Sequence, residues 1–325
     1  MAATPVTLLS GFLGSGKTTL LSHALDQNAL SNSLVIVNEF GEVAIDHLIV
    51  ADLAENILEL RNGCLCCTIR GDLAMTLRDL YHRRQLGEVN AFDHVVVETS
   101  GVADPIPLIH TLMANPPLMK AYCLDSIICV VDALHGVATI REHDTAANQV
   151  ALADLVVISK TDIASSEQGI RTKAMIEGVN PSAEIAVVVE GNIDPAMVFG
   201  RQLFDPEKQG ESIDKWMSVH DGHNHDSVYT THSIVREGTL SLAGTSVFLN
   251  HVVNEKRDKI LRIKGLAGFR EKDGAPALLH AVQEKFYPVS WLTGWPSSDH
   301  SSRLVFIGRD LDTDWLEAKF ESLCL

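Results

Sequence analysis

The sequence predicts an α/β protein: a parallel sheet with helices on both faces, followed by a smaller α+β C-terminal domain. Apolar, strand-like runs alternate with helical patterns through the first two thirds of the chain. A glycine-rich loop joins the first run to the first helix, and residues 204–226 are polar without a stable period. Because strands buried on both faces read as continuous apolar runs, the alternation predicts a parallel sheet, and the polar stretch predicts a linker.

The glycine-rich loop at residues 11–18 lies between the apolar run Val6–Leu9 and the helical pattern Lys17–Leu25. Its sequence, GFLGSGKT, matches the phosphate-binding P-loop pattern G-x4-G-K-[ST] in the required strand–loop–helix context. Lys17, which we expect to be partly exposed, should reach the β- and γ-phosphates, and the Thr18 hydroxyl should bind Mg²⁺. The residues expected to hold the nucleotide here are Gly11, Gly14, Ser15, Gly16, Lys17, Thr18 and Thr19.

The other expected elements follow in chain order. The strand-like runs of the first domain are Val6–Leu9, Leu34–Val37, Ile57–Leu60, Val95–Glu98, Ile127–Val131, Leu155–Ile158 and Ile185–Val189. Its helical patterns lie at Lys17–Leu25, Asp72–Gln85 (with Asp72 as N-cap), Pro107–Met113 and Glu167–Glu177. In the C-terminal domain we expect strands at Val228–Val235, Ile260–Ile263, Tyr287–Trp291 and Leu304–Ile307, and helices at Thr245–Asn254, Pro276–Phe286 and Thr313–Leu323.

Length and composition limit the class of protein. A chain of 325 residues fits two domains, which we place at 1–203 and 227–325 with a linker at 204–226. The net charge of −16 argues against a nucleic-acid partner, and no apolar run is long enough to span a membrane. The N-terminus leads directly into a strand, which leaves no room for a signal peptide. We therefore expect a cytoplasmic protein whose six cysteines are thiols or metal ligands.

Two motifs follow later strands, where a nucleotide site needs them. In Glu98-Thr-Ser-Gly101, we expect Glu98 on the metal side, making it a catalytic residue together with Lys17 and Thr18, and Gly101 at the γ-phosphate. In Ser159-Lys-Thr-Asp162, the Asp162 carboxylate can accept two hydrogen bonds from guanine, while the Lys160 stem lies along the base. Since adenine offers neither donor, the sequence predicts GTP rather than ATP.

Residues 63–67, GCLCC, place three cysteines within four positions. A disulfide between such near neighbours would be strained, whereas soft thiolates favour Zn²⁺, Cu(I) or related ions. The alternative is that some of these cysteines are buried small hydrophobes, and in an extended segment Cys64 and Cys66 would share a side that Cys67 does not. Glu39 and Glu42, after the second strand, could complete a metal site, orient the attacking water, or be solvated.

Taken together, GFLGSGKTTLL at 11–21, NEFGEV at 38–43, GCLCC at 63–67, ETSG at 98–101 and SKTD at 159–162 make the chain similar to the CobW-like GTPases. These are related to the nickel-insertion GTPases of urease and hydrogenase maturation. The resemblance covers nearly the whole chain. It implies a SIMIBI-class G domain, a separate C-terminal domain, and GTP hydrolysis coupled to handling zinc, cobalt or another transition metal. By motif, Cys64, Cys66 and Cys67 become the metal thiolates.

The chain departs from that family at two positions. Ser159 replaces the more usual Asn or Thr, which should weaken the bracing of the loop, and Val37 stands where some relatives carry an acid. The linker histidines, His220, His223 and His225, could collect metal or be only part of a polar linker. The remaining cysteines are expected to be core or surface thiols: Cys123, Cys129 and Cys324.

The resulting hypothesis is a GTPase that binds a transition metal, zinc foremost, and delivers it to a client metalloprotein or a cofactor-biosynthesis protein. It would act as a monomer or a nucleotide-dependent dimer. The rival hypotheses are a small-molecule kinase on the same P-loop, which would leave the three cysteines unexplained, and a non-catalytic metal buffer with a nucleotide sensor.

Overall fold

The structure of the protein, a computed structural model, describes residues 3–27, 30, 32–37, 57–59, 67–89, 92–200 and 229–325; at 57–59, 67–72 and 114 it describes the backbone alone. The chain divides into two compact units, one of residues 1–175 and 184–202, the other of 203–325 with 176–183. The predicted boundaries near 203 and 227 and the linker histidines lie outside the described residues, so the domain limits stay a prediction. In the part of the chain described, no helix is long and apolar enough to cross a membrane.

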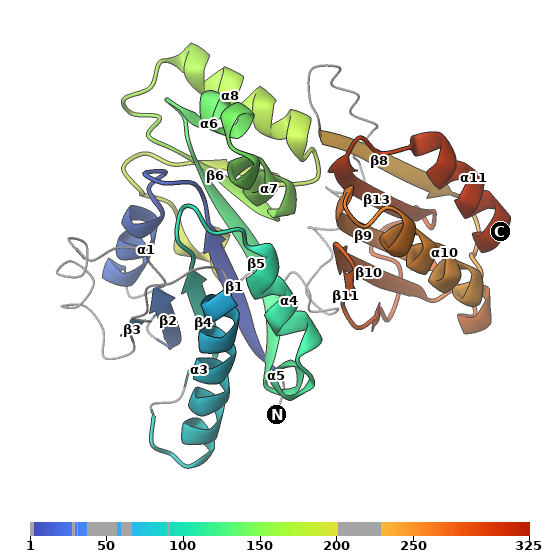
Figure 1. Ribbon diagram of the computed structural model, residues 1–325, viewed down its shortest axis with the longest axis horizontal. Helices are drawn as coiled ribbons and strands as arrows, with labels where there is room; N and C mark the ends of the chain where they lie inside the picture. The colour runs from blue at the N-terminus through green and yellow to red at the C-terminus, as the bar shows by residue number, and fades with distance from the viewer. Residues whose placement is uncertain are drawn as a thin grey trace. The chain divides into compact units, whose positions relative to one another are not determined.

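The first unit is built on a seven-stranded sheet in the order β3-β2-β4-β1-β5-β6-β7, with every neighbouring pair parallel (Figure 1). Its strands are β1 (Thr4–Ser10), β2 (Ser33–Val37), β3 (Ile57–Glu59), β4 (His94–Glu98), β5 (Tyr122–Asp132), β6 (Leu155–Ser159) and β7 (Glu184–Val187). Central β1 pairs with β4 and β5, placing Leu9 beside Glu98 and Ser10 beside Cys129. The carboxyl ends of these strands therefore meet at one edge, where ligands bind in open α/β sheets.

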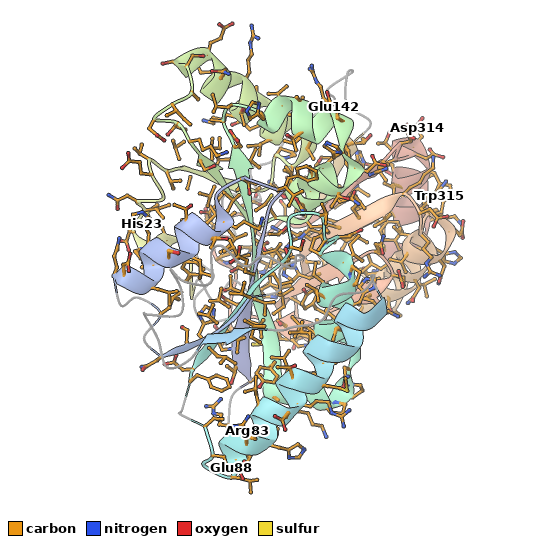
Figure 2. All side chains as sticks on the ribbon, turned by 60° about the vertical axis from the view of Figure 1, so that its left-hand side comes forward. His23, Arg83, Glu88, Glu142, Asp314 and Trp315 are labelled. Atoms are coloured by element: carbon orange, nitrogen blue, oxygen red, sulfur yellow. The ribbon has the colours of Figure 1, made fainter. Side chains whose placement is uncertain are left out.

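Helices cover both faces of this sheet, as predicted. They are α1 (Lys17–Asp26), α3 (Cys67–Gln85), α4 (Ile106–Ala114), α5 (Pro116–Ala121), α6 (Gly136–Glu142), α7 (Asp144–Leu152), α8 (Ser166–Val179) and the 3₁₀ turn η1 (Pro195–Met197). Leu20 and Leu21 of α1 pack with Leu9 and alternate residues of the neighbouring strands. Leu8 on the other face is equally buried, and α4 and α5 contact β5 there. At the C-terminal end of α3, Arg83 Nε lies 3.8 Å from Glu88 Oε2, and the two side chains are close together in Figure 2.

The second unit is an antiparallel sheet in the order β11-β10-β9-β13-β8, with β12 paired to β10. Its elements are β8 (Tyr229–Arg236), α10 (Leu242–Glu255), β9 (Ile260–Gly268), η2 (Arg270–Lys272), β10 (Pro276–Val282), β11 (Lys285–Phe286), β12 (Ser290–Trp291), β13 (Ser302–Arg309) and α11 (Thr313–Cys324). Phe248 of α10 packs edge-on against Phe306 of β13 and Phe320 of α11. These contacts form the centre of a core between the two helices and the sheet.

Three expectations for local structure are wrong. The expected strand Tyr287–Trp291 is reduced to the two residues of β12, because residues 287–289 are not in a strand. The segment Pro276–Phe286 is not a helix but β10 and β11, joined by a tight turn in which Gln283 has φ 49°. Leu278 and Leu279 point to opposite faces of the sheet and are both buried, so the strand reads as a continuous apolar run, which short helices also show. Asp72 is not an N-cap, because α3 already begins at Cys67.

Candidate nucleotide site

The P-loop connects β1 to α1 through three glycines in backbone conformations that favour glycine. Gly11, Gly14 and Gly16 have φ of 140°, 69° and 97°. A Cβ on Gly11 would lie 2.4 Å from the carbonyl oxygen of Val130, so the loop also packs too closely on β5 for another residue. Gly16 precedes α1 without a capping side chain, so phosphate oxygens can take the place of the cap at this helix N-terminus.

Lys17 is buried in this loop, with 8% of its surface exposed. Its Nζ donates to the carbonyl oxygens of Gly11 (2.9 Å) and Phe12 (3.3 Å). The expectation of a partly exposed lysine was therefore wrong: the ammonium folds back onto the loop's own carbonyls. These hydrogen bonds hold the charge within the loop, where a phosphate would compete for it.

Thr18 and Glu98 come together across 80 residues of sequence. The Thr18 hydroxyl donates to Glu98 Oε1 at 2.9 Å, and Glu98 is only 4% exposed at the end of β4. Glu98 is thus not a solvated strand end. A hydroxyl and a carboxylate beside a phosphate-binding loop are hard oxygen donors that suit Mg²⁺.

Gly101 lies against the P-loop. A Cβ there would be 2.6 Å from the backbone nitrogen of Leu13 and 2.7 Å from its Cα. The same loop is tied to β1 by the Thr99 N–H, which donates to the Leu9 carbonyl at 2.9 Å. The backbone after β4 is therefore held in close contact with the P-loop.

The motif at 159–162 forms a braced turn after β6. Ser159 was expected to brace the loop weakly, yet its Oγ donates to the carbonyl oxygens of Ser15 (2.5 Å) and Val131 (3.3 Å). Lys160 has φ 59° and pairs with Asp132 at 2.6 Å, while Asp162 is exposed at the turn. The P-loop and the predicted base-reading turn are thus bonded to each other through Ser159.

Sequence reasoning missed three parts of this site. Asp132 at the end of β5 holds Lys160, and the signal was an acid directly after an apolar strand. Gln149 of α7 bonds the loop after β4, with no signal in the sequence. The turn after β7 lies against α1, because a Cβ on Gly191 would be 2.8 Å from the ring carbon Cδ2 of His23 and 3.2 Å from the methyl Cγ2 of Thr19. Figure 2 shows where His23 lies on α1.

The predicted metal residues Glu39, Glu42, Cys64 and Cys66 lie outside the described residues, and Cys67 is described only as the first backbone position of α3. Within the described ranges, no group of three or more His, Cys, Asp and Glu residues could hold a metal ion. The other cysteines are thiols, as expected: Cys123 is exposed, and burial raises the pKa of Cys129 to about 12 and that of Cys324 to about 11.

The geometry of this site can be compared with known proteins. Residues 5–187 match the family described as "CobW/HypB/UreG, nucleotide-binding domain", which is more than half of the chain. The chain belongs to the CobW/HypB/UreG family. Residues 229–324 of this family member match the "Cobalamin synthesis protein cobW C-terminal domain". The resemblance inferred from the motifs is thereby confirmed over both units.

Relatives of this CobW/HypB/UreG member include the zinc chaperone YjiA of Escherichia coli, which is 34% identical over 98% of both chains. The zinc chaperone CobW of Pseudomonas aeruginosa is 32% identical over 96% of this chain and 89% of its own. The crystal structure of the Zn(II)-bound YjiA GTPase of E. coli is similar, with a TM-score of 0.72 over 99% of both chains at 26% identity. The α/β fold with its C-terminal α+β unit is therefore that of a solved relative.

Proposed function

We propose that this chain is a GTP-hydrolysing metallochaperone. It binds a transition metal, zinc foremost, through Cys64, Cys66 and Cys67, with Glu39 and Glu42 as further candidate ligands, and delivers it to a client metalloprotein. The observation that carries the proposal is the Thr18–Glu98 pair beside a glycine loop that encloses Lys17. The names of the relatives, which are zinc chaperones, support the choice of metal.

In the proposed reaction, water attacks the γ-phosphorus in line with the leaving oxygen, and catalysis comes from positioning and charge stabilisation. Lys17 exchanges the carbonyls of Gly11 and Phe12 for phosphate oxygens, a stronger, charge-assisted interaction. Thr18 and Glu98 would hold Mg²⁺, which would neutralise charge that develops on the phosphates. The Gly101 N–H and the N-terminus of α1 then face the γ- and β-phosphates, respectively.

Asp162 is the proposed determinant of GTP over ATP. It lies exposed on the turn that Ser159 and Thr161 hold, the latter through a 2.9 Å hydrogen bond to the Val188 carbonyl. An exposed carboxylate on a fixed turn can accept both guanine donors without a conformational change. The amide of Asp162→Asn would accept one of them and present its own donor to the other, so the variant should bind GTP more weakly.

The test uses the purified full-length chain with Mg²⁺. We expect GTP turnover well above ATP turnover, with no dependence on an added phosphate acceptor. We also expect the protein to compete with a chromogenic chelator for zinc, and Cys66→Ser to weaken this zinc binding. Acceptor-dependent phosphorylation would instead indicate the kinase, and zinc binding without turnover would indicate the buffer. Equal affinity of the wild type for ATP and GTP would refute the assignment of Asp162.

The unit from about residue 227 serves recognition of the client rather than chemistry, because the nucleotide motifs end by Asp162. The protein acts in the cytoplasm, as a monomer or as a dimer that forms with nucleotide.

A further inference from the structure

Gln149 of α7 is a buried amide that holds the loop following β4. Its side chain is 0% exposed, and Nε2 donates to the backbone carbonyls of Gly101 (3.3 Å) and Ala103 (3.0 Å). Because carbonyl oxygens only accept hydrogen bonds, the amide nitrogen must be the atom that faces the loop. Both hydrogen bonds of this nitrogen therefore go to the segment just beyond Glu98.

The same loop is fixed on its other side by β1 and the P-loop. The Thr99 N–H donates to Leu9, and the Ala103 N–H donates to Ser100, which closes a turn around Gly101. Gly101 is so close to Leu13 that no Cβ fits between them. Gln149 thus bonds to a turn that packs directly against the P-loop.

The residue that precedes α7, the helix that carries Gln149, contacts the P-loop directly. His143, the residue before α7, stacks on the ring of Phe12 with centroids 4.6 Å apart. A cavity of about 210 Å³ separates the rest of α7 from the P-loop and is lined by Phe12, Ala146, Gln149 and Val150 among others. Gln149 lines this cavity, and its amide links α7 to the loop after β4 through the two hydrogen bonds to Gly101 and Ala103.

We propose that Gln149 is a positioning residue for GTP hydrolysis, acting through Gly101 to set the distance between the γ-phosphate loop and the P-loop. This inference rests on the proposed GTPase function. GDP lacks the γ-phosphate, so loss of the amide should affect binding of the triphosphate and its turnover, while leaving GDP affinity in place. A merely structural role would weaken both nucleotides together.

The decisive variant is Gln149→Met, which keeps the length of the side chain, removes both donors, and has the adjacent cavity to accommodate its methyl group. We expect kcat to fall about tenfold or more, with GDP affinity changed by less than about twofold. The matched control is Tyr122→Phe, which deletes another buried side-chain donor, Oη to the Leu77 carbonyl (3.0 Å), away from the nucleotide loops. This control should keep the wild-type kcat.

Gln149→Glu provides a second test, because the ionised and protonated forms of its carboxyl can be compared in the same folded protein. An ionised carboxylate has no donor for Gly101 or Ala103, whereas the protonated acid supplies one O–H, and burial raises the pKa of such a carboxyl. The kcat of Gln149→Glu relative to wild type should therefore increase on going from about pH 8 to about pH 6.

Two results would overturn the inference: a wild-type kcat in Gln149→Met, or equal losses of affinity for GDP and a non-hydrolysable GTP analogue. If Gln149→Met does not fold, an unchanged relative kcat of Gln149→Glu across the two pH values overturns it. Absence of GTP turnover in the wild type would refute the proposed function instead.

Discussion

At the scale of single residues, the burial of Lys17 gives this side chain two roles. Its Nζ satisfies carbonyls of the P-loop, and it is the expected phosphate ligand. We expect Lys17→Met, which keeps the apolar stem, to lower GTP turnover at least a hundredfold, or about 2.7 kcal/mol. Turnover of GTP by purified protein is the measurement.

The control for this variant is Lys173→Met on the exposed side of α8, which removes the same charge away from the site. It should turn over GTP as the wild type does. Wild-type turnover in Lys17→Met would contradict the assignment of the P-loop lysine.

His94 makes stability depend on pH. It is 6% exposed, Thr7 Oγ1 lies 2.9 Å from its Nε2, and burial lowers its pKa from 6.5 to about 4, against the opposing effect of the Asp93 charge. The unfolded chain therefore binds a proton between these pH values that the folded chain does not. Stability should fall as pH drops from about 6.5 to about 4, by about 3 kcal/mol in total.

Denaturant unfolding at pH 7 and pH 4.5 measures this dependence. His94→Gln keeps a polar side chain without a titrating ring, so its stability should change less with pH than that of the wild type. The exposed His82, replaced as His82→Gln, should leave the wild-type dependence in place. If His94→Gln loses as much stability on acidification as the wild type, other groups cause the loss.

At the scale of elements, the turn after β4 and the P-loop form one tightly packed unit. Gly101→Ala would place a methyl 2.6 Å from the Leu13 backbone nitrogen, and backbone cannot move aside as a side chain does. We expect this variant to weaken binding of a non-hydrolysable GTP analogue about tenfold or more, because the P-loop must shift. Titration of the analogue by calorimetry tests the effect.

Gly169→Ala is the matched comparison, since nothing lies within 4 Å of its Cβ position in α8. It should bind the analogue normally and unfold at an equal or higher temperature, because alanine favours a helix by roughly 0.5–1 kcal/mol. Equal binding by both glycine variants would show that the Gly101 turn can move without affecting the nucleotide.

At the scale of the whole molecule, the nucleotide and metal functions should be energetically coupled. The turn at Gly101 leads into α4, α4 packs against α3, and α3 begins at Cys67. A displacement of the γ-phosphate loop therefore has a packed route to the helix that begins at Cys67. We expect zinc affinity to differ between GTP- and GDP-bound protein by about 1–3 kcal/mol, with the reciprocal effect on GTP.

Competition of zinc with a chromogenic chelator, with GDP and with a non-hydrolysable GTP analogue, measures this coupling. Cys66→Ser should abolish the difference and spare nucleotide binding, because serine cannot replace a soft thiolate. Identical zinc affinities in both states would leave the metallochaperone without a mechanism for release.

The sequence by itself determined the features that are local. The P-loop could be read from residues 11–18 because three glycines, Lys17 and Thr18 stand in one short segment between a strand and a helix. The parallel sheet could be read because its strands are apolar throughout, and both predictions are confirmed by the fold and the family.

Tertiary structure alone decided what depends on residues far apart in the chain. The burial of Lys17, the contact of Thr18 with Glu98 and the tie from Gln149 to Gly101 arise because parallel strands bring distant loops to one edge of the sheet. The strand at Pro276–Val282 was mistaken for a helix because its pairing with β9, not its apolar run, fixes the conformation. The local sequence pattern shows which side chains are apolar. Hydrogen bonds between strands and packing between loops, however, form only when the chain folds.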